Sequence, residues 1–170
     1  FDEYPNWLDA VGAILDRSAD AIKGDDAAQL FFDVARELAD TAYATYLNSI
    51  EPVAFLYDLN VRNVIIRDGR MTGIIDVDEI WYGDPLLAVG RGKALLLGMR
   101  RDTELIDYWC AHLKLSGDIA RVVDLYALLY CIRFMATSGQ ILNGNYSIQT
   151  APENVPVFKA IAESLVRTLN

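Results

Sequence analysis

The stretch that decides the fold is VIIRDGRMTGII, residues 64–75. It contains two apolar, β-branched runs separated by the pair Asp68-Gly69. An Asp-Gly pair between two such runs predicts a β-hairpin with a two-residue turn. Strand signals dominate in this part of the chain, whereas the flanking sequence carries mostly helical patterns. The hairpin is therefore the feature around which the rest of the fold is predicted.

Placing the turn at Asp68-Gly69 fixes the expected register of the hairpin. The predicted pairs are Arg67 with Arg70, Ile65 with Thr72, and Asn63 with Ile74. Side chains alternate between the two faces of a strand, so Asn63 and Asp76 are expected on the same face as diagonal neighbours. Both side chains carry oxygen, which is the ligand type that Mg²⁺ prefers. The register predicts a metal site at the open end of the hairpin, with Asp58 in the loop just before it.

Asp58, Asn63 and Asp76 together are the set that phosphoryl transfer requires. One carboxylate orients a hydroxyl, and two further oxygen ligands hold Mg²⁺. Asp76 ends an apolar strand, where an unpaired carboxylate is costly unless a cation accompanies it. Taken alone, Asp58 is also consistent with an Asx turn and Asn63 with a loop cap.

Three motifs occur in order along the chain: Asp58-x-x-x-x-Asn63, Ile75-Asp76-x-Asp78-Glu79, and Gly83-Asp84-Pro85. This order and spacing resemble the aminoglycoside phosphotransferase and choline-kinase-like family, a branch of the protein-kinase-like fold. The resemblance covers about residues 55–97. The sequence departs from the usual family pattern at Leu56 (His in the family), Tyr57 (Gly), Asn60 (often His) and Val77 (Trp). Ala88 stands near the position where the family often has an acidic residue.

The resemblance implies an α+β, predominantly helical fold: a protein-kinase-like carboxyl-terminal lobe whose short β-hairpin carries the metal site. By the same resemblance, Asp58 is the catalytic residue, and Asn63 and Asp76 bind the Mg²⁺ that accompanies ATP. Supporting or substrate-contacting roles fall to Asp78, Glu79 and Tyr57. The implied activity is transfer of the ATP γ-phosphoryl group to a hydroxyl of a small molecule, such as an aminoglycoside, a choline-like amine or a sugar.

Two alternatives stay open at this point. Leu56 and Ala88 also fit a catalytically degenerate kinase-like module, a pseudoenzyme that binds a ligand without turnover. A purely helical interaction domain is a third interpretation, but it leaves the hairpin and Asp76 unexplained.

A kinase-like nucleotide site also needs a Gly-rich loop and a strand lysine over the phosphates. The sequence contains no G-x-G-x-x-G, and the nearest lookalike, GRGK at residues 90–93, falls in a predicted helix. We interpret that segment as structural. Residues 1–170 are therefore expected to form a single domain, with the nucleotide-covering amino-terminal lobe supplied by sequence that this chain lacks.

Composition and charge narrow the class of partner. The formal net charge of −9 argues against nucleic acid, because neutralising phosphates requires clustered Lys and Arg. That charge is compatible with a cationic substrate, and equally with solubility alone. No apolar run reaches the length of a membrane span. Cys110 and Cys131 lack metal-ligand spacing and are expected to be buried thiols of a cytoplasmic protein.

Apolar periodicity predicts helices on both sides of the hairpin. A first helix is expected from Pro5 to before Gly24, and a second from Asp25 to about Leu47. Further expected elements are a strand over Val53–Leu56 and helices over about 84–98, 103–113, 118–142 and 152–169, with Asn143-Gly144-Asn145 as a stop. Asp84 is expected to cap the helix that follows it, and His112, the sole histidine, to lie away from the site.

Overall fold

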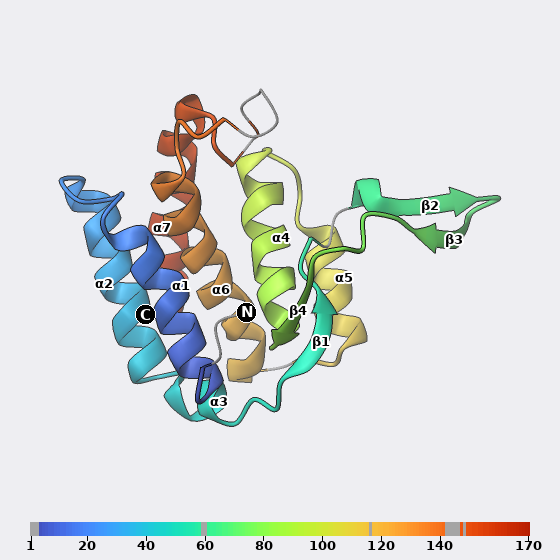
Figure 1. Cartoon of the computed structure of the whole chain (residues 1–170), viewed down its shortest axis with the longest axis horizontal. Helices are drawn as coiled ribbons and strands as arrows, with labels where there is room; N and C mark the ends of the chain where they lie inside the picture. Colours follow the sequence, from blue (N-terminus) through green and yellow to red (C-terminus); the bar gives the residue numbers. More distant parts are fainter. Residues whose placement is uncertain (1–3, 59–60, 116, 142–146, 148) are drawn as a thin grey trace.

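The computed structural model describes residues 4–58, 61–115, 117–141, 147 and 149–170, and only the backbone of residue 61. Figure 1 shows the elements, which follow the chain as α1 (Trp7–Ala19), α2 (Asp26–Asp40), α3 (Ala44–Asn48), β1 (Val53–Leu56), the 3-10 turn η1 (Val61–Asn63), β2 (Val64–Arg67), β3 (Arg70–Ile74), β4 (Ile80–Gly83), α4 (Leu86–Gly98), α5 (Glu104–His112), α6 (Gly117–Ala136), η2 (Pro152–Asn154) and α7 (Val155–Leu169). Helices predominate and the strands form small antiparallel sheets, which confirms the α+β expectation.

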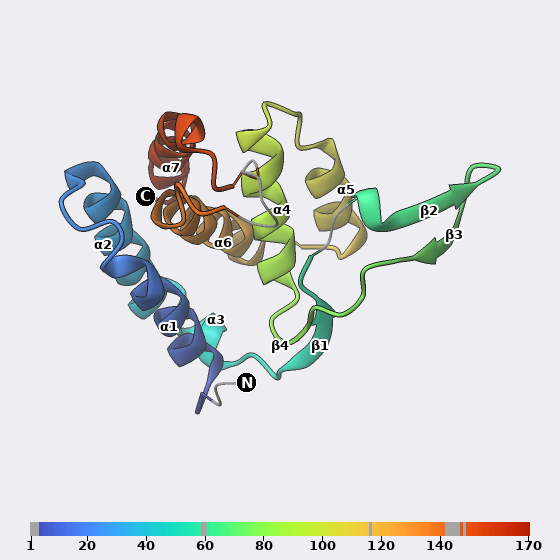
Figure 2. The same ribbon diagram turned by 45° about the horizontal axis from the view of Figure 1, so that its top comes forward.

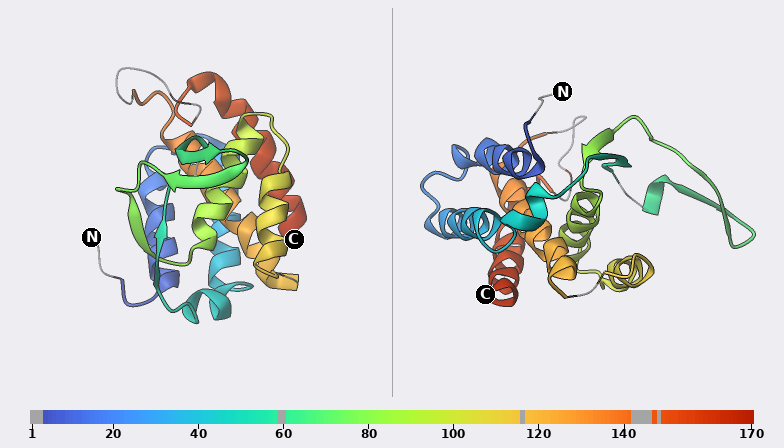
Figure 3. Two further views of the ribbon diagram at one scale, coloured as in Figure 1. Left: turned by 90° about the vertical axis from the view of Figure 1, so that its right-hand side faces the viewer. Right: turned by 90° about the horizontal axis from the view of Figure 1, so that it is seen from below.

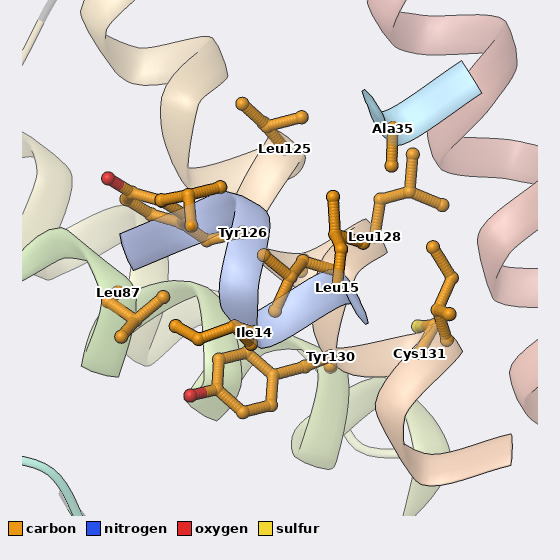
Figure 4. Close-up of a cluster of buried hydrophobic side chains, with 14 of the residues drawn as sticks. Ile14, Leu15, Ala35, Leu87, Leu125, Tyr126, Leu128, Tyr130 and Cys131 are labelled. Atoms are coloured by element: carbon orange, nitrogen blue, oxygen red, sulfur yellow. The ribbon is translucent and has the colours of Figure 1, made fainter. Parts of the chain in front are cut away.

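Helix α6 lies at the centre of the core. It packs against α4, α7, α2 and α1, and side chains all around it are buried. Figure 4 shows Tyr126 and Tyr130 of α6 beside Leu87 of α4 and Ile14 of α1. Each large apolar side chain buried in this way contributes roughly 1.5–3 kcal/mol to folding. The core therefore holds α4, which borders the candidate site, firmly against α6.

Side-chain caps explain where the first two helices begin. The Asn6 carboxamide accepts a hydrogen bond from the Asp9 amide at 2.8 Å, and α1 starts directly after Asn6. Asp25 caps α2 in the same way, as the sequence predicted. The predicted extension of this helix to Leu47 is wrong, because α2 ends at Thr41. There the backbone leaves helical geometry, and the hydroxyl and amide of Thr41 both donate to the Glu37 carbonyl.

Strand β1 pairs antiparallel with β4, from Val53 opposite Gly83 to Leu56 opposite Ile80. The sequence predicted β1 but not β4. Gly83 ends β4 with φ +152°, and a Cβ atom at this position would lie 2.0 Å from the Trp7 ring. Only glycine allows the strand to pass this close to α1.

The predicted β2–β3 hairpin is present, but its register differs from the prediction beyond the turn. Arg67 pairs with Arg70 as expected, whereas Ile65 lies opposite Gly73 instead of Thr72. A bulge between Ile65 and Ile66 shifts the ladder, and the Thr72 hydroxyl donates to the Ile65 carbonyl at 3.3 Å. Consequently Val64, not Asn63, pairs with Ile74. Figure 2 and the right panel of Figure 3 show the hairpin extending away from the helices.

Several remaining predictions concern the helices after the hairpin. Helices α4, α5 and α7 occupy the expected regions, while α6 ends at Ala136 and the predicted stop at 143–145 lies outside the described residues. Cys110 and Cys131 are free thiols, half-buried and buried respectively, and burial raises the pKa of each. In the described part of the chain, no helix is long and apolar enough to cross a membrane.

Candidate active site at the junction of the two ladders

The candidate site lies where the β1–β4 ladder gives way to the β2–β3 ladder. On one side of this junction the Tyr57 amide donates to the Glu79 carbonyl at 2.9 Å. On the other side the Ile75 amide donates to the Asn63 carbonyl at 2.8 Å. These two backbone bonds join residues 57 and 63 to the two ends of segment 75–79. The residues predicted for the site all fall within segments 57–63 and 75–79.

Asp76 occupies an unusual backbone position at this junction. It follows β3 with φ +59°, a left-handed conformation that Asp and Asn tolerate better than most residues. Its carboxyl group is exposed and its pKa is raised, chiefly by the neighbouring Asp78 carboxylate and a hydrogen bond with it. The Asp58 carboxylate adds a smaller increase. Asp76 thus lies within electrostatic reach of the Asp78 and Asp58 carboxylates, an arrangement that a bound cation would relieve.

Asn63 contacts the backbone of Asp58. Its side-chain amide donates to the Asp58 backbone carbonyl at 3.4 Å. The Nδ2 group of Asn63 therefore makes the capping bond that one interpretation of the sequence expected. The amide oxygen is the atom of Asn63 that suits a metal ion.

Arg91 is the residue of the site that the sequence analysis missed. It projects from α4, and its guanidinium pairs with Oδ1 of Asp58 at 2.7 Å. The Arg91 side chain is 9% exposed, whereas the Asp58 side chain is 28% exposed. The prediction that GRGK lies in a helix is confirmed, but its arginine contacts the candidate catalytic residue. A usable signal existed in the spacing: Leu87, Arg91 and Ala94 lie on one buried helical stripe, where a charge requires a partner.

An aromatic stack supports the Arg91 guanidinium. Its Cζ atom lies 4.9 Å from the centroid of the Tyr57 ring. Tyr57 in turn stacks on Trp81 of β4, with the ring centroids 4.0 Å apart and the planes at 7°. Tyr57, predicted to support the site or to contact substrate, is buried in this stack next to Asp58. The stack restricts the guanidinium to a plane beside the carboxylate.

The donor set at the junction fits Mg²⁺ by its chemistry. Asn63, Asp76 and Asp78 offer oxygen atoms, and the mutual repulsion of the carboxylates favours a cation. The residues that the structure describes contain no group of three or more His, Cys, Asp or Glu side chains that could hold a metal ion. This does not conflict with magnesium, which typically takes one or two carboxylates and completes its shell with phosphate oxygens and water.

Asp84 of the Gly83-Asp84-Pro85 motif is buried, at 2% exposure. Its Oδ1 accepts from the Leu86 amide, the first amide of α4, at 2.9 Å, although the N-cap residue is Pro85 and not Asp84 as predicted. Its Oδ2 also accepts from the hydroxyls of Tyr46 and Tyr126, at 2.9 and 2.8 Å. Burial raises the pKa of Asp84, although these hydrogen bonds act in the opposite direction. Asp84 thus anchors the connection between β4 and α4 to the helical core.

A cavity of about 960 Å³ adjoins the aromatic stack. Trp81 and Tyr82 of β4 line one side, and Tyr4 and Trp7 line another. Within the described residues, the cavity wall includes neither Asp58 nor any other carboxylate. The cavity therefore shares Trp81 with the aromatic stack and is separate from the acidic junction. His112 lies at the end of α5 with its ring stacked on Tyr108, and it lines a second cavity together with Leu56 and Ala88.

A known family of phosphotransferases matches this chain. The model of the phosphotransferase enzyme family (APH) matches residues 3–125, which is more than half of the chain and includes every residue of the junction. No curated protein and no solved structure matches the chain. The family match supports phosphotransferase activity in general terms. On the strength of this match, the chain belongs to the phosphotransferase enzyme family.

Proposed function

We propose that this chain carries the catalytic centre of an ATP-dependent kinase for a small molecule with a free hydroxyl group. The observation that supports this most strongly is the gathering of Asp58, Asn63 and Asp76 at one ladder junction, in a member of a phosphotransferase family. We infer that the acceptor belongs to the aminoglycoside, choline-like or sugar class. The acidic junction favours a cationic acceptor among these.

In the proposed reaction the acceptor hydroxyl oxygen attacks the γ-phosphorus of ATP. A new oxygen–phosphorus bond forms as the bond from the γ-phosphorus to the β–γ bridging oxygen breaks, and ADP leaves. Asp58 orients the hydroxyl and takes its proton late in the step. Because Arg91 occupies Oδ1, we assign the proton to Oδ2 of Asp58.

Asn63 and Asp76 are the residues that would hold the metal at this junction, with Asp78 beside them. Bound Mg²⁺ would offset the negative charge of the phosphates. The 170 residues contain no Gly-rich phosphate loop, and we propose that further sequence of the same protein covers the phosphates. The experiments below therefore use the intact protein.

The test is a measurement of ADP formation with a panel of aminoglycosides, choline, sugars and macrolides, and with water as the default acceptor. Replacing Asp58 by Asn should lower kcat by roughly 10²–10⁴-fold, the usual contribution of a positioned acid–base group. Asp68→Asn is the matched control, because Asp68 is an exposed residue of the hairpin turn whose left-handed backbone Asn also tolerates. An Asp58→Asn protein as active as the parent would refute the assignment.

A second candidate function is the pseudoenzyme, and one observation favours it: the Asp58 carboxylate is already paired with a buried guanidinium. Such pairing suits a site kept for binding rather than turnover. Magnesium-dependent ATP binding by the intact protein, with no ADP formed from any acceptor or from water, would establish this function in place of the kinase.

A further inference from the structure

We propose that Arg91 is a positioning residue of the site, which holds Oδ1 of Asp58 so that Oδ2 faces the acceptor hydroxyl. This inference rests on the proposed function and deepens it. It concerns how the carboxylate is aimed, and it assigns a role to a helix residue that none of the three sequence motifs includes.

The geometry of the ion pair is the first argument. The Arg91 Nη1 to Asp58 Oδ1 distance of 2.7 Å is that of a charge-assisted hydrogen bond. Arg91 is nearly buried and Asp58 is partly exposed, so the arginine contacts the carboxylate from the protein side. A carboxylate held by one oxygen from within leaves the other oxygen as the one that solvent or substrate can meet.

The rigidity of the arginine is the second argument. Its guanidinium lies over the Tyr57 ring, which is stacked on Trp81, so its plane is set by two aromatic residues. Its helix is equally fixed, since Gly90 brings α4 so near α6 that an added Cβ would lie 2.4 Å from Cβ of Tyr126. A side chain held at both ends can transmit a definite orientation to Asp58.

The location of Asp58 shows why such a brace is needed. Asp58 follows β1 and belongs to none of the strands among the described residues. The Asn63 amide holds its backbone carbonyl, while Arg91 holds its carboxylate. Backbone and side chain of Asp58 are thus anchored by separate residues. Misplacing a reacting group by about 1 Å costs up to about 100-fold in rate.

The test compares kcat and KM for ATP in the intact protein, with ADP release and water as the acceptor. Arg91→Met should lower kcat by about 10- to 100-fold while KM for ATP stays within about twofold of the parent. Arg91→Lys should restore part of the loss, because it returns the charge but not the planar, stacked group.

Lys93→Met is the matched control. Lys93 lies two residues further along the same helix and makes its own ion pair, with Asp124. Removing that pair perturbs α4 without touching Asp58, so kcat should stay within about twofold of the parent. An equal loss of kcat in Lys93→Met and Arg91→Met would show a general effect on the helix and would overturn the proposal.

A double variant separates positioning from mere stabilisation. If Arg91 acts through the Asp58 carboxylate, Arg91→Met should change kcat by less than about twofold once Asp58 is already Asn. The same fractional loss in both backgrounds would overturn the inference.

The failure of this inference is distinguishable from failure of the proposed function. An active parent that loses activity in Asp58→Asn but not in Arg91→Met contradicts only the role of Arg91. A parent that forms no ADP, or an Asp58→Asn variant as active as the parent, contradicts the proposed function and this inference together.

Discussion

At the residue scale, Asp84 shows how one buried carboxylate can connect distant parts of the chain. It accepts hydrogen bonds from Tyr46 of α3, Tyr126 of α6 and the first amide of α4. The Tyr126 hydroxyl also accepts from the Trp7 indole at 2.7 Å, which brings in α1. The start of α4, and with it the base from which Arg91 projects, is therefore fixed by a single side chain.

Replacing Asp84 by Ala should lower the free energy of unfolding by roughly 2–4 kcal/mol, because two tyrosine hydroxyls and a backbone amide lose their acceptor. Urea unfolding followed by circular dichroism measures this change. Asp40→Ala is the matched control: Asp40 is exposed at the end of α2, and its replacement should cost less than about 0.5 kcal/mol. Equal effects of the two substitutions would contradict the structural role of Asp84.

The same carboxyl group should give the stability a pH dependence of defined sign. Burial raises its pKa in the folded protein above the ordinary value of about 3.9, so the folded state retains the proton to higher pH than the unfolded state. This contribution to the free energy of unfolding is complete at pH values below the ordinary pKa. It is lost as the pH rises through the raised pKa of the folded protein. In Asp84→Asn this decrease in the free energy of unfolding with rising pH should be absent. A pH profile of stability equal to that of the parent would contradict the assignment.

Spacing along the sequence predicted the hairpin and placed Asp58, Asn63 and Asp76 near its open end. The predicted placement of Asn63 and Asp76 on one face was wrong in its basis, because it assumed that Asn63 pairs with Ile74, whereas Val64 does. Asp58, Asn63 and Asp76 are close in sequence and are joined by one hairpin, so local rules apply to them. Arg91 was missed because its contact with Asp58 spans 33 residues and depends on how α4 packs. The same holds for Asp84, whose bond to the Leu86 amide is local, while its tyrosine partners lie far away in the sequence.

At the element scale, α4 is positioned by its close approach to α6. A Cβ atom on Gly90 would lie 2.4 Å from Cβ of Tyr126 and 2.9 Å from the Val123 carbonyl oxygen. A Cβ atom on Gly92 would meet only the tip of Ile106, at 3.7 Å. Two glycines of one helix therefore have opposite structural requirements.

We predict that Gly90→Ala destabilises the protein by roughly 1–3 kcal/mol, since backbone and core atoms of α6 would have to move. Gly92→Ala should instead stabilise it by about 0.5–1 kcal/mol, because alanine loses less conformational entropy in a helix and fits the available space. Thermal unfolding of the two variants, side by side, checks the difference. Equal stabilities would mean that α4 and α6 are not packed this closely.

The elements themselves were predicted unevenly, for physical reasons. Caps and apolar periodicity indicated the helices well, and Asp-Gly located the hairpin turn. The break at Thr41 was missed because its side chain forms a local bond that apolar periodicity does not reveal. The register shift at the bulge between Ile65 and Ile66 was missed because the turn type alone does not show where one strand of a ladder gains a residue.

At the scale of the whole molecule, the site lies at the border between a packed helical body and a projecting hairpin (Figure 1). Helix α4 supplies Arg91, while the residues on either side of the hairpin supply Asp58, Asn63 and Asp76. Large apolar residues on the hairpin, such as Ile66 and Met71, are exposed. An isolated two-stranded hairpin is marginally stable, so the two backbone bonds at the junction matter for keeping the acidic residues together.

The central claim is that this junction binds Mg²⁺ with ATP, and calorimetric titration of the intact protein with Mg·ATP tests it most directly. We predict magnesium-dependent binding in the parent and in Asp68→Ala, the control on the hairpin turn. In Asp76→Ala, binding should weaken at least about tenfold, because a carboxylate ligand of the metal is lost. Equal affinities of the parent and Asp76→Ala for Mg·ATP, or no binding by the intact parent, would contradict the claim.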